Sequence, residues 1–126
     1  MDIFAFNKAN IDFIHSSTVD TCVARIHPHP FWIVLDRICY HVHETPVYII
    51  YRNRPVPYDY VHLFDSYLHI RNIQKPLFSI SMYTHADLAS MASSLRHPIG
   101  TKPVMYAKMK AEMGVNEHVV KKLIQH

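Results

Sequence analysis

The scarcity of glycine constrains this chain more than any motif in it. Among its 126 residues, only Gly100 and Gly114 are glycine. Loops that bind phosphate groups need several glycines, because the backbone must approach the ligand closely there. The sequence contains neither a GxGxxG nor a GxxxxGK[ST] pattern, so it argues against a classical nucleotide-binding fold.

The hydrophobic pattern changes near residue 75, from strand-like to helical. Before this point, alternating or β-branched runs predict strands at 18–26, 31–38 and 46–53. Residues 59–73 have the spacing of an amphipathic helix, and residues 75–83 return to period two.

The last third of the chain has helical patterns. The sequence THAD, residues 84–87, is typical of a capping box with Asp in place of Glu, and predicts a helix that runs to about residue 96. Further helices are predicted at 104–113, ended by Gly114, and from Asn116 onward.

This order predicts one α+β domain over residues 1–126, with a β-rich part over about 1–83 and a helical part over about 84–126. We expect a small antiparallel sheet of about four strands with helices on one side and a helical C-terminal third. The chain is 49% hydrophobic, which is enough for a continuous core.

The sequence also bounds the location of the protein. No apolar run approaches the roughly 20 residues of a membrane-spanning helix, and the N-terminal residues do not look like a signal peptide. We therefore expect a protein of the cytoplasm, or of the nucleus in a eukaryote, with no membrane partner. The two cysteines, Cys22 and Cys39, are predicted to be free thiols. The sequence is compatible with a homodimer.

The segment CYHVHETP, residues 39–46, suggests a metal site. On a strand, Cys39, His41 and His43 would share one face, because residues two apart point the same way. Thiolate and neutral imidazole are good zinc ligands, so the segment predicts a site for a divalent ion, zinc or manganese. A fourth ligand would come from Cys22, His27 or His29. With eleven histidines in the chain, the alternative is that these side chains are hydrogen-bonded residues of the sheet wall.

His41-Val42-His43, followed by Tyr106 on a predicted helix with Lys110 one turn later, resembles the HUH single-strand endonucleases and single-tyrosine transposases. In that family, two histidines hold a divalent ion that polarises a phosphate, and the tyrosine attacks it and stays linked to the DNA. The resemblance implies a metal-dependent nuclease or phosphoesterase that uses His41 and His43 as ligands and Tyr106 as the nucleophile.

The segment VMYAKMKAEMGVNEHVVKKLIQ, residues 104–125, resembles a helix-turn-helix with Gly114 in the turn. Its second helix would point Asn116, Glu117, His118, Lys121, Lys122 and Gln125 outward. Such a helix can enter a major groove, with lysines on phosphates and amides on bases. The alternative is a plain pair of packing helices, in which Met105, Met109 and Met113 fill the core.

A third signal is the basic and aromatic stretch YIIYRNRPVPYDYVH, residues 48–62, which joins Arg52 and Arg54 with four tyrosines. Aromatic rings beside arginines are typical of single-strand recognition. Tyr and Arg are also enriched at protein interfaces. A strand end followed by a solvated loop is the structural alternative.

These signals favour a small nucleic-acid-binding protein, and the net charge of +3 is compatible with a polyanionic partner. The predicted contacts are Arg52, Arg54, Lys108, Lys110, Asn116, His118, Lys121 and Lys122. One alternative is a non-catalytic protein-interaction module, such as a small inhibitor or adaptor that binds a protein partner. The other is the HUH-like enzyme, and the sequence defines no catalytic triad.

Overall fold

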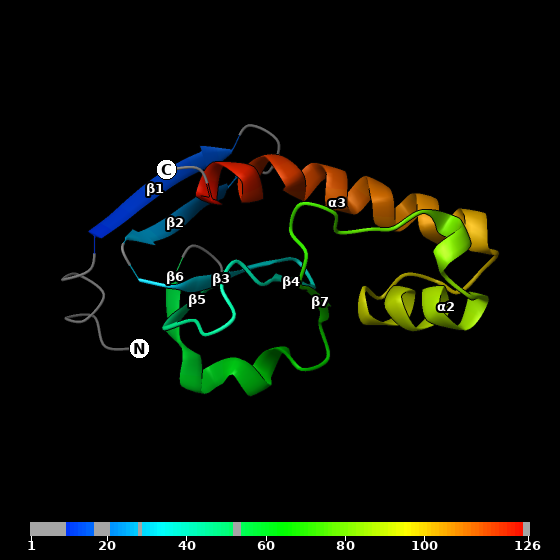
Figure 1. The fold of residues 1–126 in the computed structure, drawn as a ribbon, viewed down its shortest axis with the longest axis horizontal. Coiled ribbons are helices and arrows are strands. Elements are labelled where there is room, and N and C mark those ends of the chain that lie inside the picture. Colours follow the sequence, from blue (N-terminus) through cyan, green and yellow to red (C-terminus); the bar gives the residue numbers. More distant parts are fainter. Residues whose placement is uncertain (1–9, 17–20, 28, 52–53, 125–126) are drawn as a thin grey trace.

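The structure is a computed structural model that describes residues 10–16, 21–27, 29–51 and 54–124, with side chains described from residue 29 onward. It contains two sheets (Figure 1). The smaller sheet is an antiparallel hairpin of β1 (Asn10–Ser16) and β2 (Thr21–His27). The larger sheet has five strands in the order β6-β5-β3-β4-β7.

The five-stranded sheet is mixed, whereas the sequence predicted an antiparallel one. Its strands are β3 (Phe31–Leu35), β4 (Ile38–Tyr40), β5 (Tyr48–Tyr51), β6 (Arg54–Pro57) and β7 (Leu68–Ile70). Strand β3 pairs antiparallel with β4 and parallel with β5, while β4 pairs parallel with β7. The mixture arises because β5 lies on the far side of β3 and not beside β4. The α+β class itself is confirmed.

A two-residue turn joins β3 to β4 and sets the register of the sheet. Leu35 pairs with Ile38, so only Asp36 and Arg37 form the loop. Asp36 has a φ of 54°, a left-handed conformation that Asp adopts more readily than most residues.

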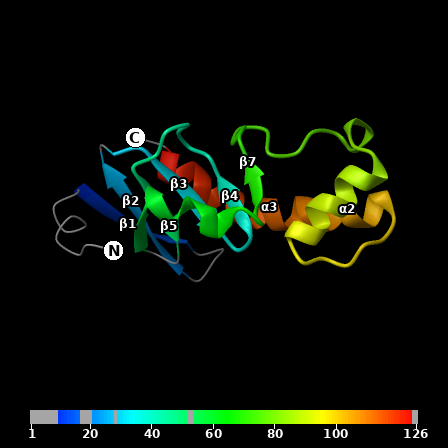
Figure 2. The same ribbon diagram turned by 90° about the horizontal axis from the view of Figure 1, so that it is seen from below.

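The two faces of the sheet carry two separate core clusters, because neighbouring strand residues point to opposite faces. Phe31, Ile33 and Leu35 belong to the cluster that contains the buried residues of the helices. Trp32 and Val34 belong to a smaller cluster on the other face, together with Cys39, Ile49 and Phe64. Figure 2 shows the helical layer running along one side of the sheet and extending beyond it.

Helix α2 (His85–Ser94) confirms the predicted capping box. The Thr84 hydroxyl accepts from the Asp87 backbone N–H, and the Thr84 N–H donates to the Asp87 carboxylate. Leu88, Ala92 and Leu95 are buried, at the spacing of one helix face.

Helix α3 (Lys102–Ile124) is one continuous helix of 23 residues, so the predicted turn at Gly114 is wrong. The buried stripe passes through this position with unbroken spacing of three and four: Met105, Met109, Met113, Asn116, Val120 and Leu123. Packing of this stripe keeps Gly114 helical despite its low helix propensity. The prediction that the three methionines fill the core is confirmed.

Two other predicted elements are replaced in the structure. The helix expected at 59–73 is a 3-10 helix, η1 (Tyr58–Phe64), followed by β7, because pairing of Leu68–Ile70 with β4 overrides the helical spacing. The strand expected at 75–83 is mainly loop and ends in a second 3-10 helix, η2 (Ile80–Met82). The described part of the chain contains no helix long and apolar enough to cross a membrane.

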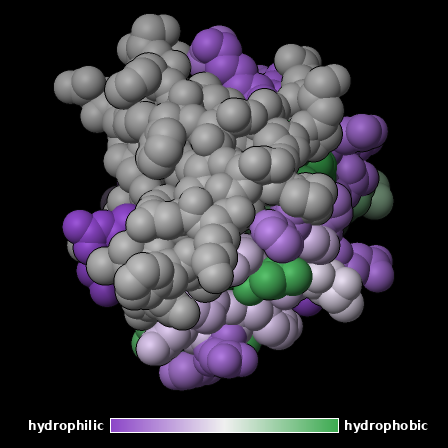
Figure 3. All heavy atoms as spheres, turned by 90° about the vertical axis from the view of Figure 1, so that its left-hand side faces the viewer, coloured by the Kyte–Doolittle hydropathy of each residue, from purple (hydrophilic) through white to green (hydrophobic). Residues whose placement is uncertain are grey.

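The end of the molecule that carries β1 and β2 is seen in Figure 3. The described residues visible on that face are mostly hydrophilic, and the hydrophobic ones are scattered among them. Single exposed apolar side chains of this kind are normal on a protein surface.

Candidate metal centre

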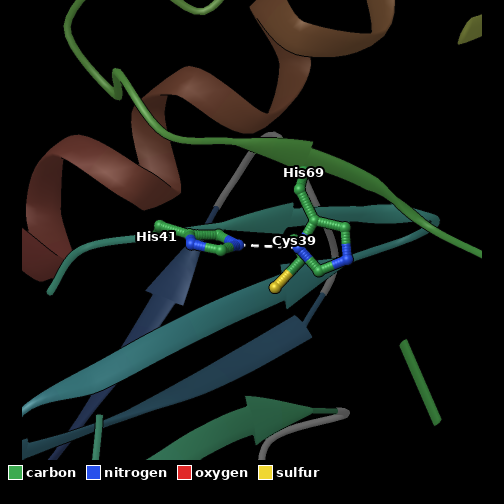
Figure 4. Close-up of side chains that lie close together, drawn as sticks. All are labelled: Cys39, His41 and His69. Carbon is green, nitrogen blue, oxygen red and sulfur yellow. Dashed lines mark hydrogen bonds between the residues drawn. The ribbon is translucent and has the colours of Figure 1, made fainter. Parts of the chain in front are cut away.

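Three metal-ligating side chains meet on the face of the sheet that points away from α3 (Figure 4). Cys39 lies in β4 and His69 lies opposite it in β7. His41 follows β4 directly, and its backbone N–H donates to the Ile70 carbonyl at 2.9 Å, which continues the pairing. The thiol sulfur and one nitrogen of each imidazole lie within 4.8 Å of one another.

The group is buried in the smaller core cluster. The exposed fraction is 0% for Cys39 and 7% for His41, while His69 is half-buried. The indole of Trp32 stacks on the His41 ring, with centroids 3.8 Å apart. The same indole contacts the edge of His69, and its N–H donates to the His43 carbonyl. Trp32 therefore covers both histidine rings with apolar surface.

Hydrogen bonds define the tautomers of the two histidines in their uncharged forms. His69 Nε2 lies 2.7 Å from the Phe64 carbonyl oxygen, which only accepts, so Nε2 carries the hydrogen. His69 Nδ1 then offers a lone pair to His41 Nε2, which donates to it at 2.7 Å. His41 Nδ1 is left with a lone pair, and the Arg71 Nη1 group lies 3.5 Å from it.

Burial shifts the ionisation of two of the three groups. Desolvation raises the pKa of the Cys39 thiol to about 12, against a smaller lowering by Arg71. Desolvation, with added repulsion from His69 and Arg71, lowers the pKa of His41 to about 4. At neutral pH the thiol is protonated and His41 is uncharged, so Cys39 is a poor nucleophile unless a cation replaces its proton.

This Cys/His/His group can hold a metal ion. The structure brings Cys39 and His41 together, as the period of a strand predicts, but it does not bring His43 to them. The strand ends at Tyr40, and His43 is exposed in the following loop, where its ring contacts Phe31. Because the chain turns there, the alternation of side chains no longer applies.

The sequence analysis missed His69 as a candidate ligand, although the sequence contained a signal for it. In LHI, residues 68–70, His69 alternates with two apolar residues that point to the other core cluster. The helical spacing of the longer segment concealed this short strand. The sequence alone does not show that β4 pairs with β7, so it gives no reason to place Cys39 beside a residue thirty positions later.

Tyr106 lies on the opposite side of the sheet from this group. It packs against the helical core cluster, and its hydroxyl donates to the Phe78 carbonyl at 2.6 Å. An HUH-like site needs two histidines and a tyrosine around one ion. The structure brings together neither His41 with His43 nor Tyr106 with either of them.

The exposed residues among the predicted nucleic-acid contacts lie on α3 and at the start of β6. Lys108, Lys110, His118, Lys121 and Lys122 are exposed on α3, and Arg54 is exposed at the start of β6. The prediction that Asn116 points outward is wrong, because it is 1% exposed and donates to the Tyr40 hydroxyl at 3.2 Å.

Several residues named from the sequence have no described side chain. Arg52 lies outside the described residues, as do the side chains of Cys22 and His27, two of the proposed fourth ligands. The third, His29, is described, and its ring contacts Tyr48.

Comparison of the chain with protein-family models, with curated protein sequences and with solved structures finds no match. The chemistry of the chain's own residues is therefore the basis for assigning a function.

Proposed function

We propose that this protein binds a zinc ion through the Cys39 thiolate and one imidazole nitrogen each of His41 and His69. The observation that carries the proposal is the convergence of one sulfur and two nitrogen donors within 4.8 Å in a buried site. Buried polar side chains usually have bonding partners. Here the pairing of β4 with β7 brings all three donors close together.

The donor set favours zinc over manganese. Thiolate and imidazole are ligands of zinc, whereas manganese prefers carboxylate, carbonyl and water oxygens. Among the described residues, no carboxylate belongs to the group. Three protein donors would leave a fourth tetrahedral position for water or another ligand.

The hydrogen bonds around the group suit a metal ligand at His69. Its Nε2–H donates to the Phe64 carbonyl, which is the outer contact that commonly orients a ligating histidine and leaves Nδ1 available. A zinc ion would take the place of the hydrogen between His41 Nε2 and His69 Nδ1. Since two nitrogens on one tetrahedral zinc are about 3.3 Å apart, the present separation of 2.7 Å would have to widen slightly.

The test is metal binding by the full chain, purified without a His-tag, with Co²⁺ as a spectroscopic stand-in for zinc. We expect one ion per chain, with the near-ultraviolet absorption of a cobalt–thiolate bond. Cys39→Ala should remove that absorption, and His69→Gln should weaken binding at least about tenfold.

The matched control is His43→Gln, two residues from His41 but exposed and outside the group. This variant should bind metal as the wild type does. Full metal binding by folded Cys39→Ala and His69→Gln proteins would refute the proposal. Loss of binding in the His43 variant instead would restore the site predicted from the sequence. Circular dichroism establishes that each variant is folded.

A second candidate function, polyanion binding by α3, is favoured by the position of its cations. At about 100° per residue, Lys108, Lys110, His118, Lys121 and Lys122 fall within about 160° of the helix circumference, on the exposed side. The helix contains five lysines and two glutamates, Glu112 and Glu117, which border this arc. Such a face can contact the phosphates of a nucleic acid without a helix-turn-helix.

Fluorescence anisotropy with labelled single-stranded and duplex DNA tests this second candidate. Binding should weaken steeply between 50 and 200 mM salt, to about the extent that several phosphate contacts predict. A Lys108→Gln/Lys122→Gln variant should bind more weakly with a smaller salt slope. Lys75→Gln, an exposed lysine outside α3, is the control. Binding that does not depend on salt or on these lysines would exclude a polyanion site on this face.

A further inference from the structure

A groove runs along α3 on the side of the sheet opposite the metal group. It has a volume of about 470 Å³ and lies between the helix and the segment that connects β7 to η2. Its walls are mainly apolar, with Ile73, Leu77 and Phe78 on one side and Met113, Val120 and Ile124 on the other. Pockets of this size and character are typical of small-molecule sites.

The shape of the groove limits what can occupy it. Its helical wall extends from Tyr106 to Ile124, a distance of about 27 Å along the axis. A helix about 10 Å across and 27 Å long would fill about 2,000 Å³, far more than this groove offers. An extended peptide would place unpaired backbone groups against apolar walls. A single hydrocarbon chain is thinner than a helix and has no backbone groups to leave unpaired.

Two hydrogen-bond donors that line this groove have no acceptor among the described residues. Lys110 has no ion pair among the described residues, whereas Lys121, further along, is paired with Glu117 at 2.8 Å. Tyr40 is 2% exposed, and its hydroxyl accepts from Asn116 but donates to no group in the described part of the chain. Burial also raises the pKa of Tyr40 to about 12, so this hydroxyl keeps its hydrogen. A ligand with an anionic oxygen would supply the missing acceptor.

Gly114 provides a further reason to regard the groove as a binding site. Glycine inside a helix costs about 1 kcal/mol relative to alanine, yet this one lies near the middle of α3. Apart from the adjoining residues and the helix's own backbone, no atom lies within 4 Å of the place where a Cβ would be, so the core does not require a glycine. Gly114 does line the groove, and the missing side chain leaves its wall open to a ligand.

We infer that this groove binds a linear carboxylic acid, with its hydrocarbon chain between α3 and residues 73–79 and its carboxylate held by Lys110. The apolar walls remove the chain from water, and the carboxylate pairs with the cation that lacks a partner. This inference does not depend on the metal site, which lies on the other face of the sheet.

Isothermal titration calorimetry of the full chain with dodecanoate, below its micelle concentration, tests the inference. We expect saturable binding of one molecule per chain. Gly114→Leu fills the groove and should weaken binding about tenfold. Leucine is a better helix former than glycine, so this variant should fold. Ala111→Leu makes a similar change at an exposed position of α3 outside the groove and should have little effect.

A second pair of variants tests the role of the charge. Lys110→Gln should weaken dodecanoate binding about threefold to fivefold and leave dodecanol binding unchanged. Lys108→Gln, on the same helix but outside the groove, should alter neither. Absence of saturable dodecanoate binding would overturn the inference. Equal effects of Gly114→Leu and Ala111→Leu, or equal binding of dodecanoate and dodecyltrimethylammonium, would also overturn it.

Discussion

At Cys39 and His41, burial favours the uncharged form of each side chain. The pKa of the thiol is raised to about 12 and that of the imidazole is lowered to about 4. A neutral thiol and a neutral imidazole fit the apolar cluster around them, whereas either charged form alone would be costly there. In the proposed zinc site, the same two side chains would become ligands once the thiol loses its proton.

The lowered pKa of His41 predicts that acid destabilises the metal-free protein. An unfolded histidine binds a proton below about pH 6.5, but folded His41 does so only near pH 4. The free energy of unfolding should therefore fall between these values, and by about 2 to 3 kcal/mol at pH 4.5 from this residue alone. Urea unfolding at pH 7 and pH 4.5 measures the change.

Comparison of two variants isolates this contribution from the other histidines. His41→Gln should lose less stability than the wild type over this pH range, while His43→Gln should behave like the wild type. Emission of Trp32, the only tryptophan, provides a second readout, because protonation of the stacked His41 ring should quench it. An identical pH response in wild type and His41→Gln would show that His41 titrates normally.

Arg71 gives a prediction for the metal site. Its guanidinium lies near His41 Nδ1 and lowers the pKa of both Cys39 and His41. The positive charge of Arg71 repels a bound cation. It also faces His41 Nδ1, the nitrogen that would carry a hydrogen if His41 Nε2 bound the metal. Arg71→Gln should therefore tighten zinc binding about fivefold, as measured by competition with a chelator.

Arg54→Gln removes an exposed arginine at the opposite edge of the sheet and should leave the affinity unchanged. Weaker zinc binding by Arg71→Gln would mean that Arg71 supports the site and does not oppose it.

At the scale of the element, α3 depends on its packed stripe more than on its own helix propensity. Gly114 interrupts a favourable sequence, but the buried side chains before and after it lie on one face and pack against the same core. In most proteins the stability of a helix comes largely from such packing. For this reason a glycine that predicted a turn became part of a continuous helix.

Gly114→Ala should raise the free energy of unfolding by about 0.5 to 1 kcal/mol, because alanine favours the helix and open space surrounds the new Cβ. The reverse change at a nearby exposed position, Ala111→Gly, should lower it by a similar amount. Urea unfolding with both variants at one pH makes the comparison. If Gly114→Ala were destabilising, the backbone at this position would not be the regular helix of the structure.

At the scale of the molecule, the two proposed sites lie on opposite faces of the sheet. The metal group belongs to the face covered by Trp32 and η1, while the groove belongs to the helical face. Zinc would join β4 to β7, a pair of strands held by only three register pairs. Because the three candidate ligands come together only in the folded chain, we expect metal binding to be coupled to folding.

Zinc should therefore stabilise the whole protein, and more strongly at higher pH. At a free zinc concentration 100 times its Kd, the gain is about 2.7 kcal/mol. Since the Cys39 thiol must lose its proton, zinc affinity should rise about tenfold per pH unit between pH 6 and pH 8. Thermal unfolding with zinc and with excess chelator checks the first effect, and calorimetry in buffers of different ionisation enthalpy counts the released protons. Release of no proton would show that Cys39 is not a ligand.

The sequence by itself determined the features that depend on neighbours along the chain. The α+β class, the capping box at Thr84 and the methionine core stripe of α3 follow from local periodicity and local hydrogen bonding. The shared face of Cys39 and His41 follows from the period of a strand.

Only the tertiary structure decided which distant residues meet. Residues 68–70 form a strand because β4 offers an edge to pair with, and that pairing brings His69 to Cys39. His43 lies outside the group because the strand ends before it, and Gly114 stays in a helix because buried side chains before and after it pack on one face. Each outcome depends on contacts between segments far apart in sequence, whose free energy exceeds the local preferences that periodicity and propensity report.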